Sequence, residues 1–173
     1  MKFNLFLFFL FFFYSINTFA TNIRVVEFNK IIESNKILIS LYDEIKNDQL
    51  NHTTKFEEKE KELKKSLDNI DQLRLILDND ELESEINTYN DNLNKFNIKI
   101  KKFNDHYDAQ INNLRNQIID VILNLLKQYS EENAIDLILD NNSYIISSNS
   151  INITEIILSK SNQIKIEFSF EKY

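Results

Sequence analysis

One long stretch, residues 82–129, carries apolar residues at alternating spacings of four and three. The seam runs through Leu82, Ile86, Tyr89, Leu93, Phe96, Ile100, Phe103 and Tyr107, and resumes after Gln110 through Leu114, Ile118, Val121 and Leu125. A repeat that averages 3.5 residues puts these side chains on one stripe of one helix, and the chain has no Gly or Pro to interrupt it. At about 1.5 Å per residue the helix is roughly 70 Å long, so its stripe needs a partner.

The partner lies immediately upstream. In an antiparallel hairpin, the numbers of facing residues have a constant sum, and apolar residues on the two sides keep this rule. The pairs are Leu77 with Leu82, Leu73 with Ile86, Ile70 with Tyr89, Leu67 with Leu93, Leu63 with Phe96, Phe56 with Phe103, Ile45 with Leu114 and Leu41 with Ile118. We predict a helical hairpin over residues 37–129 with its turn at residues 78–80. The alternative is two unrelated amphipathic helices, which would have no reason to keep this register.

Polar residues interrupt the seam. Lys59 faces Ile100 and His52 faces Tyr107, and such layers weaken the pairing and should let the hairpin bend. The two histidines, His52 and His106, fall at similar heights on the two helices. We interpret them as unconnected surface or seam residues rather than as a pH sensor.

Residues 1–20 differ from the rest of the chain. Lys2 precedes an apolar run at residues 3–14, and Thr18 and Ala20 are small residues at the positions that a signal peptidase reads. The run is short for a membrane span of about 20 residues, which predicts a cleavable secretory signal peptide. The alternative is a retained anchor. Without cysteine, the secreted chain would need no disulfide.

Residues 21–36 and 130–173 predict a small β-rich body. Residues 23–28 are typical of a strand, residues 135–139 and 144–147 of a β-hairpin, and residues 155–161 of a short helix. Residues 164–170 alternate apolar and polar side chains, which predicts an amphipathic edge strand that pairs with the β body so that its apolar face is covered. With no glycine, we expect Asn133, Asn141 and Asn142 to supply positive φ angles.

So small a body buries little apolar surface, so we expect it to oligomerise. The expected interface residues are Ile23, Val25, Leu137, Leu139, Tyr144 and Ile146.

The composition argues against an enzyme. A chain without glycine has no phosphate-binding loop, and a chain without cysteine has no thiol nucleophile or zinc knuckle. Carboxylate pairs such as Glu57 and Glu58 belong to charged, solvated helix faces. We therefore expect no catalysis, cofactor or metal, and no nucleic-acid partner.

Both ends of the chain resemble the Skp/OmpH family of periplasmic chaperones. Residues 23–28, followed by residues 31–34, are similar to its N-terminal strand and turn. Residues 135–140, 143–146 and 152–157 are similar to its closing strand pair and its Asp-Ile-Thr helix start, with Asn152 in place of Asp. The likeness covers residues 1 to about 161. The family glycines expected after Ser34 and before the strand at residue 135 are missing.

The resemblance implies an α+β fold in which a small β body trimerises and carries three helical hairpins around a cavity. It implies an ATP-independent holdase of the periplasm that binds unfolded outer-membrane proteins there and keeps them soluble. A structural coiled-coil spacer or adaptor of the cell envelope is the alternative function. For residues 164–170, the alternative to an edge strand of the body is a segment that imitates the terminal strand of a β-barrel client and occupies the cavity until a client displaces it.

Charge along the hairpin is uneven. Residues 66–92, the tip, hold eight acidic side chains against Arg74, a net charge of −7, which argues against direct binding to anionic lipid. Nearer the body, eight lysines and two glutamates give +6. This basic collar consists of Lys59, Lys61, Lys64, Lys65, Lys95, Lys99, Lys101 and Lys102. It either forms ordinary i,i+4 pairs on solvated helices or attracts acidic segments of a client protein.

Overall fold

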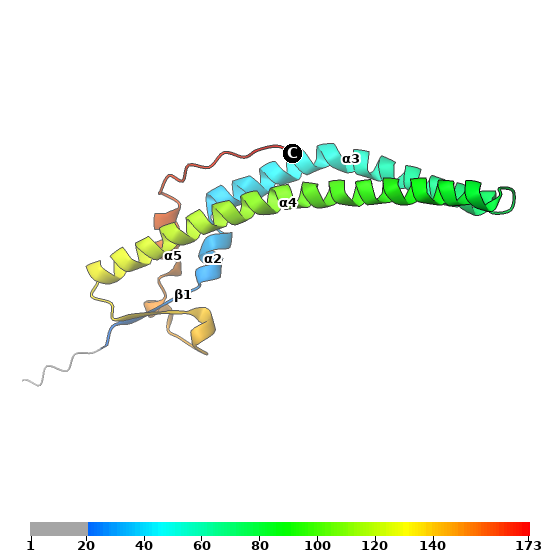
Figure 1. The fold of residues 1–173 in the computed structure, drawn as a ribbon. Helices are drawn as coiled ribbons and strands as arrows, with labels where there is room; N and C mark the ends of the chain where they lie inside the picture. Colours follow the sequence, from blue (N-terminus) through cyan, green and yellow to red (C-terminus); the bar gives the residue numbers. More distant parts are fainter. Residues whose placement is uncertain (1–20) are drawn as a thin grey trace, which may run out of the picture.

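The computed structural model describes residues 21–173, and the predicted signal peptide lies outside them. Two long antiparallel helices, α3 (Lys36–Leu73) and α4 (Asn79–Glu132), form a curved shaft that projects from a small body (Figure 1). The predicted helical hairpin is therefore confirmed. Its turn lies at residues 74–78, slightly earlier than predicted, because the Asp78 carboxylate accepts the Glu81 backbone N–H at 2.9 Å and so caps α4.

Burial along the seam is strongest near the body. Leu41 and Ile118, a predicted facing pair, are both almost fully buried. Farther out, the rings of Phe56 and Phe103 meet edge to face with centroids 4.9 Å apart, as the predicted register requires. Two helices alone leave one side of this seam open, and Leu67 is 41% exposed.

The sheet of the body is parallel and joins the two ends of the chain. β1 (Ile23–Val26) pairs with β2 (Leu137–Asp140), with Ile23 opposite Leu137 and Val26 opposite Asp140. The predicted β-hairpin at residues 135–147 is wrong, because residues 144–147 form no strand. The Asp140 carboxylate accepts the Asn142 backbone N–H, and the chain enters a short 3₁₀ turn, η1 (Asn141–Ser143), instead of reversing direction.

Two short helices pack the body against the shaft. Ile31 and Ile32 of α2 (Phe28–Glu33) and Ile157 of α5 (Thr154–Ser161) are buried in the same core as Ile118 and Ile122 of α4. A second 3₁₀ turn, η2 (Asn149–Ile151), precedes α5. The resulting core is continuous from the body into the base of the shaft.

Ala134, after α4, takes the positive φ that we expected of asparagine. Its φ is 48°, the only positive φ of a non-glycine residue within residues 21–173, whereas Asn133 has φ −111°. Asn133 caps α4, and the Asn22 side chain donates to the carbonyls of both Asn133 and Ala134. The left-handed turn therefore falls one residue later, three residues before β2 begins at Leu137.

Residues 162–173, here called the tail, run back along the shaft and end beside α3 and α4 (Figure 1). The predicted edge strand is wrong, because these residues form no strand. The apolar residues of their alternating pattern contact the helices instead of a sheet: Ile166, Phe168 and Phe170 pack on the core of the shaft. The apolar face is covered by helices rather than by a sheet.

Candidate functional site

An apolar groove opens between the two helices halfway along the shaft. It has a volume of about 620 Å³. Its apolar lining is Phe56, Leu63, Leu67, Leu93, Phe96 and Ile100, and its polar lining is Thr53, Glu57, Glu60, Lys64 and Asn97. These apolar residues belong to the seam that the sequence predicted, and all of them except the buried Leu63 are only partly covered or exposed. The groove can therefore accept an apolar group from outside the chain.

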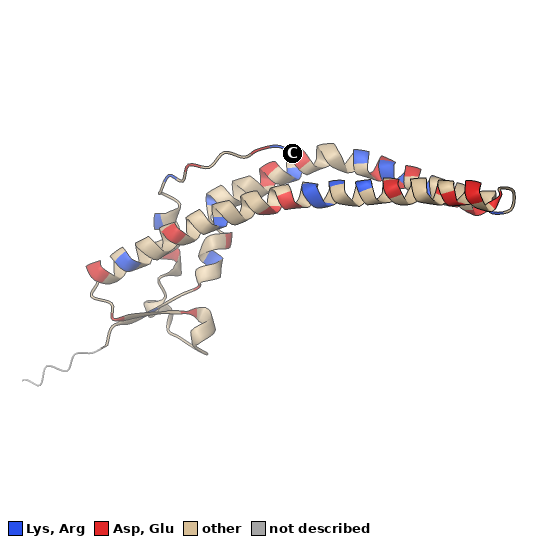
Figure 2. Ribbon diagram, viewed as in Figure 1, with Lys and Arg blue, Asp and Glu red and all other residues tan. Residues whose placement is uncertain are grey.

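The basic collar surrounds this groove. Figure 2 shows lysines on both helices at mid-shaft, and Lys64 lines the groove itself. The Lys99 ammonium lies 5.8 Å from the ring centre of Phe56, within reach of a cation–π contact. An apolar segment with acidic flanks would therefore meet complementary charge at this height.

Three collar lysines are paired within their own helices, as the ordinary interpretation of the collar expects. Lys59 bonds Glu62 at 2.9 Å, Lys95 bonds Asp91 at 2.6 Å, and Lys101 bonds Asp105 at 2.6 Å. The other five have no ion-pair partner within residues 21–173: Lys61, Lys64, Lys65, Lys99 and Lys102. Those five ammonium groups lie outside ion pairs, and the lining of the groove carries the Glu57 and Glu60 carboxylates beside Lys64.

The far end of the shaft is acidic, as Figure 2 shows. At the turn, Leu75 and Ile76 are 89% and 79% exposed. These two residues were not predicted to be exposed, although with Leu77 they form an apolar run directly before the acidic residues that open α4. The tip therefore combines an apolar pair with surrounding negative charge.

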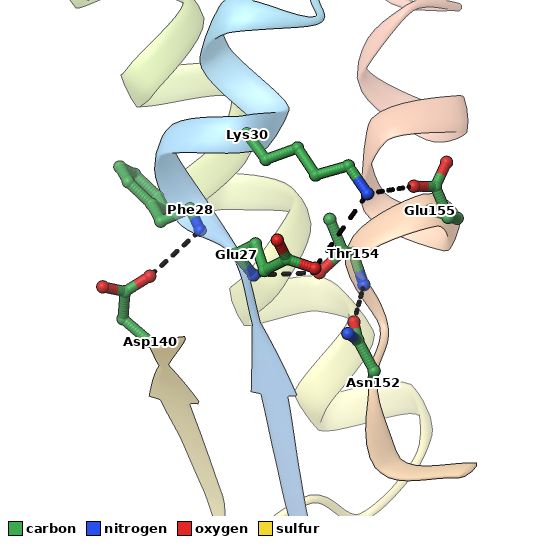
Figure 3. A network of polar contacts seen from close by, with 7 residues as sticks. All are labelled: Glu27, Phe28, Lys30, Asp140, Asn152, Thr154 and Glu155. Carbon is green, nitrogen blue, oxygen red and sulfur yellow. Dashed lines mark hydrogen bonds and ion pairs between the residues drawn. The ribbon is translucent and has the colours of Figure 1, made fainter. Parts of the chain in front are cut away.

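Backbone groups at the end of the sheet are held by side chains from distant segments (Figure 3). The Phe28 N–H donates to Asp140 Oδ1 at 3.0 Å, and this bond is the main cause that lowers the pKa of the Asp140 carboxyl. The Glu27 N–H donates to the Thr154 hydroxyl at 2.9 Å. Two C-terminal segments, the end of β2 and the start of α5, are thereby fixed to the start of α2.

The start of α5 completes this network. Asn152 Oδ1 accepts the Thr154 backbone N–H at 2.9 Å and so forms an Asx turn immediately before α5, whose N-cap residue is Ile153. The Lys30 ammonium lies 2.9 Å from the Glu155 carboxylate, which raises the pKa of Lys30. The network holds the body rigidly at the base of the shaft.

Of the six residues predicted for the oligomer interface, four lie in the sheet and two lie outside it. In the sheet Ile23 lies opposite Leu137 and Val25 lies opposite Leu139, and Val25 is buried within the chain. Tyr144 and Ile146 lie outside any strand. Leu137 is 46% exposed, and Ile145 and Ile146 are almost fully exposed, so the body carries uncovered apolar side chains.

A polar and aromatic cluster, which sequence reasoning missed, receives the end of the tail. The Tyr173 ring lies 5.6 Å from the rings of both His52 and His106, so our interpretation of the histidines as unconnected is wrong. The Tyr173 N–H donates to Asp48 Oδ2 at 3.0 Å, and the Tyr107 hydroxyl donates to the same oxygen at 2.7 Å. The missed signal was the polar layers that His52 and Gln110 make in the seam, with His106 beside Tyr107 at the same height.

Asp48 remains ionised inside this cluster. Burial alone would raise the pKa of its carboxyl, but the bonds from Tyr107 and Tyr173, with His52 and Lys172 nearby, hold that pKa below its ordinary value. Burial, followed by the bond to Asp48, raises the pKa of Tyr107. The tyrosine therefore stays a neutral donor to a charged acceptor.

Within residues 21–173, no group of three or more acidic or histidine side chains is placed to hold a metal ion. The helices in this range include none with the length and apolar character to cross a membrane.

The fold is that of an α+β protein in which a long, charged helical hairpin with an open apolar groove projects from a small body. Residues 22–160 match the family model described as outer membrane protein (OmpH-like). The chain belongs to this OmpH-like family, which supports a periplasmic chaperone function in general terms.

A solved structure shares the fold. A proposed outer membrane chaperone (OmpH-like) from Caulobacter crescentus CB15 superposes with a TM-score of 0.65 at 12% identity, covering 88% of this chain and 90% of that one. Among curated proteins, none matches the sequence. The tail beyond residue 160 lies outside the family match.

Proposed function

We propose that this protein is an ATP-independent holdase of the periplasm that binds unfolded outer-membrane proteins and keeps them soluble. The observation that carries the proposal is the partly open seam, which exposes a groove of about 620 Å³ between two helices of a family chaperone. A spacer would gain stability by closing its seam, whereas a holdase needs accessible apolar surface. The groove meets that need without exposing a large patch.

The basic collar supplies the second contact. Its five lysines without ion-pair partners attract the acidic segments of a client at long range, and the groove then takes the apolar side chains. Such binding needs no nucleotide, because neither step requires a conformational change driven by hydrolysis. Collar contacts would weaken with added salt, since exposed charges are screened over about 8 to 10 Å.

We propose further that three copies assemble through the body. Leu137, Ile145 and Ile146 give the body an apolar surface that residues 21–173 leave exposed. Three hairpins anchored side by side would surround a shared space, with their grooves available to one client. The uncovered side chains support an interface there, and the number three rests on the family resemblance.

The test is suppression of aggregation. An outer-membrane β-barrel protein, unfolded in urea, is diluted with mature chain (residues 21–173) and no ATP, and turbidity is followed. We expect suppression to saturate near one trimer per client. Leu67→Gln, which changes the groove, should require several-fold more protein, whereas the matched control Leu50→Gln, 62% exposed on α3 outside the groove, should act like the unmodified chain.

The alternative function, a structural spacer or adaptor of the envelope, predicts different results. A spacer would leave turbidity unchanged and would bind only folded partners. Equal activity of Leu67→Gln and Leu50→Gln, with suppression intact, would move the client site away from the groove.

A further inference from the structure

The tail is attached to the shaft in an unusual way. From residue 165 onward, none of its backbone groups bonds another backbone group within residues 21–173, and the last such bond joins Ile164 N–H to the Ser161 carbonyl at 3.2 Å. The tail can therefore leave the shaft without breaking a helix or a sheet.

Its side chains alternate between two environments. Ile166, Phe168 and Phe170 are half-buried against the core of the shaft, and the Phe170 ring stacks on Tyr107 with centroids 6.3 Å apart. Lys165 and Glu167 face solvent and are nearly fully exposed. The shaft thus receives every second side chain of an extended segment, as a neighbouring sheet would.

The polar contacts from the shaft go to the backbone of the tail. The Gln110 side-chain amide donates to the Glu171 carbonyl at 2.8 Å and accepts the Glu171 N–H at 2.8 Å. His106 Nε2 lies 2.8 Å from the same carbonyl, and Asp48 accepts the Tyr173 N–H. Gln110 therefore bonds both backbone groups of one residue, in the manner of a strand neighbour.

Backbone contacts carry little sequence information, because every residue except proline offers the same N–H and C=O groups. Sequence preference comes only from the apolar positions two residues apart. A site of this design accepts many segments that are extended and alternately apolar. Segments of that kind are the strands of an unfolded β-barrel protein.

We propose that the face of the shaft beneath residues 164–173 is a binding site for extended, alternately apolar client segments, with the tail as its resident occupant. The inference rests on the proposed function and deepens it. The tail covers the apolar face while no client is present, and a client strand displaces it. Displacement costs no secondary structure, since the tail has none.

The test compares full mature chains that differ only in how firmly the tail is held. In the released variant, Phe168→Asp and Phe170→Asp remove apolar tail contacts and leave α3 and α4 unchanged. The probe is a fluorescent peptide with the sequence of residues 164–173, and the control peptide has the same composition without the alternation. Anisotropy should show the probe binding the released variant at least tenfold more tightly than the unmodified chain, with the control peptide binding neither.

A third variant addresses the backbone contacts. Gln110→Ala added to the released variant should weaken probe binding about tenfold, because two hydrogen bonds are lost. The matched change Gln117→Ala, on α4 away from the tail contacts, should leave binding unchanged. If the double aspartate variant does not fold, Glu171→Pro releases the tail by removing the N–H that Gln110 accepts.

A folded released variant that binds the probe no more tightly than the unmodified chain would overturn the proposal, as would equal binding of the control peptide. In either case the tail only stabilises the shaft and does not cover a client-binding site. If the peptide test fails while the unmodified chain still suppresses aggregation, only this binding site is refuted. If the unmodified chain does not suppress aggregation, the proposed holdase function is refuted.

Discussion

The Tyr107 hydroxyl on α4 donates a 2.7 Å hydrogen bond to the buried Asp48 carboxylate on α3, and joins the two helices where the tail ends. Tyr107 is 2% exposed and Asp48 is 5% exposed, so water does not compete for this bond. The contact crosses the seam at a height where polar layers would otherwise weaken the pairing.

Tyr107→Phe should lower the free energy of unfolding by about 1.5–3 kcal/mol, the range for a hydrogen bond to a charged group. Urea denaturation followed by circular dichroism gives the value. Tyr89→Phe is the matched control, because the half-buried Tyr89 has no side-chain hydrogen bond within residues 21–173. Equal effects of the two substitutions would show that the Asp48 bond contributes nothing.

Stability should depend on pH through Asp48. The pKa of its carboxyl is lowered in the folded state, so its contribution is fully present above the unfolded pKa of about 4 and is lost as the pH falls through the folded-state value. The free energy of unfolding, measured by urea denaturation at several pH values from 7 to 3, should fall less steeply with decreasing pH for Asp48→Asn than for the unmodified chain. Parallel slopes would contradict the assignment.

Ala134→Gly should stabilise the protein by about 1 kcal/mol. At a φ of 48° the Cβ of alanine crowds the backbone, and glycine has no Cβ. The control is Ala109→Gly, at an exposed position inside α4, which should destabilise by about 1 kcal/mol. Opposite signs in thermal denaturation are the expected result. A loss of stability in both variants would show that the turn tolerates alanine.

The acidic tip should keep the shaft away from anionic membranes. The mature chain should not sediment with anionic liposomes at low salt, and changing Asp80, Glu81 and Glu83 to Lys should produce binding. Asp78 is left unchanged because it caps α4. The exposed side chains of Leu75 and Ile76 favour membrane binding and so oppose the effect of the charge. Binding of the unmodified chain to anionic liposomes would show that these two side chains outweigh the charge.

The shaft was predictable from sequence because its seam repeats across many residues, so that Phe56 and Phe103 could be paired by number alone. The strand pairing was not predictable. The partner of β2 is β1, more than a hundred residues earlier, and the residues at 140–142 permit both a hairpin and the 3₁₀ turn that forms. The tail shows a related limit, because its alternation correctly predicted a covered face but could not distinguish a sheet from a pair of helices.

The groove was only partly foreseen. Its apolar lining residues were all assigned to the seam, but burial in a two-helix hairpin depends on the separation of the helices, which periodicity does not specify. The lysines of the collar were found by counting charge. Which of them are paired depends on rotamers, which the sequence does not reveal.

The molar mass of the complex between this protein and its client tests the central claim most directly. Light scattering of the mature chain should give the mass of three copies, and addition of an unfolded outer-membrane β-barrel protein without ATP should add the mass of one client. Dilution should dissociate and unfold the free protein together, because the body is stable only when its apolar surface is covered. A folded monomer that persists on dilution and takes up no client would contradict both the assembly and the holdase function.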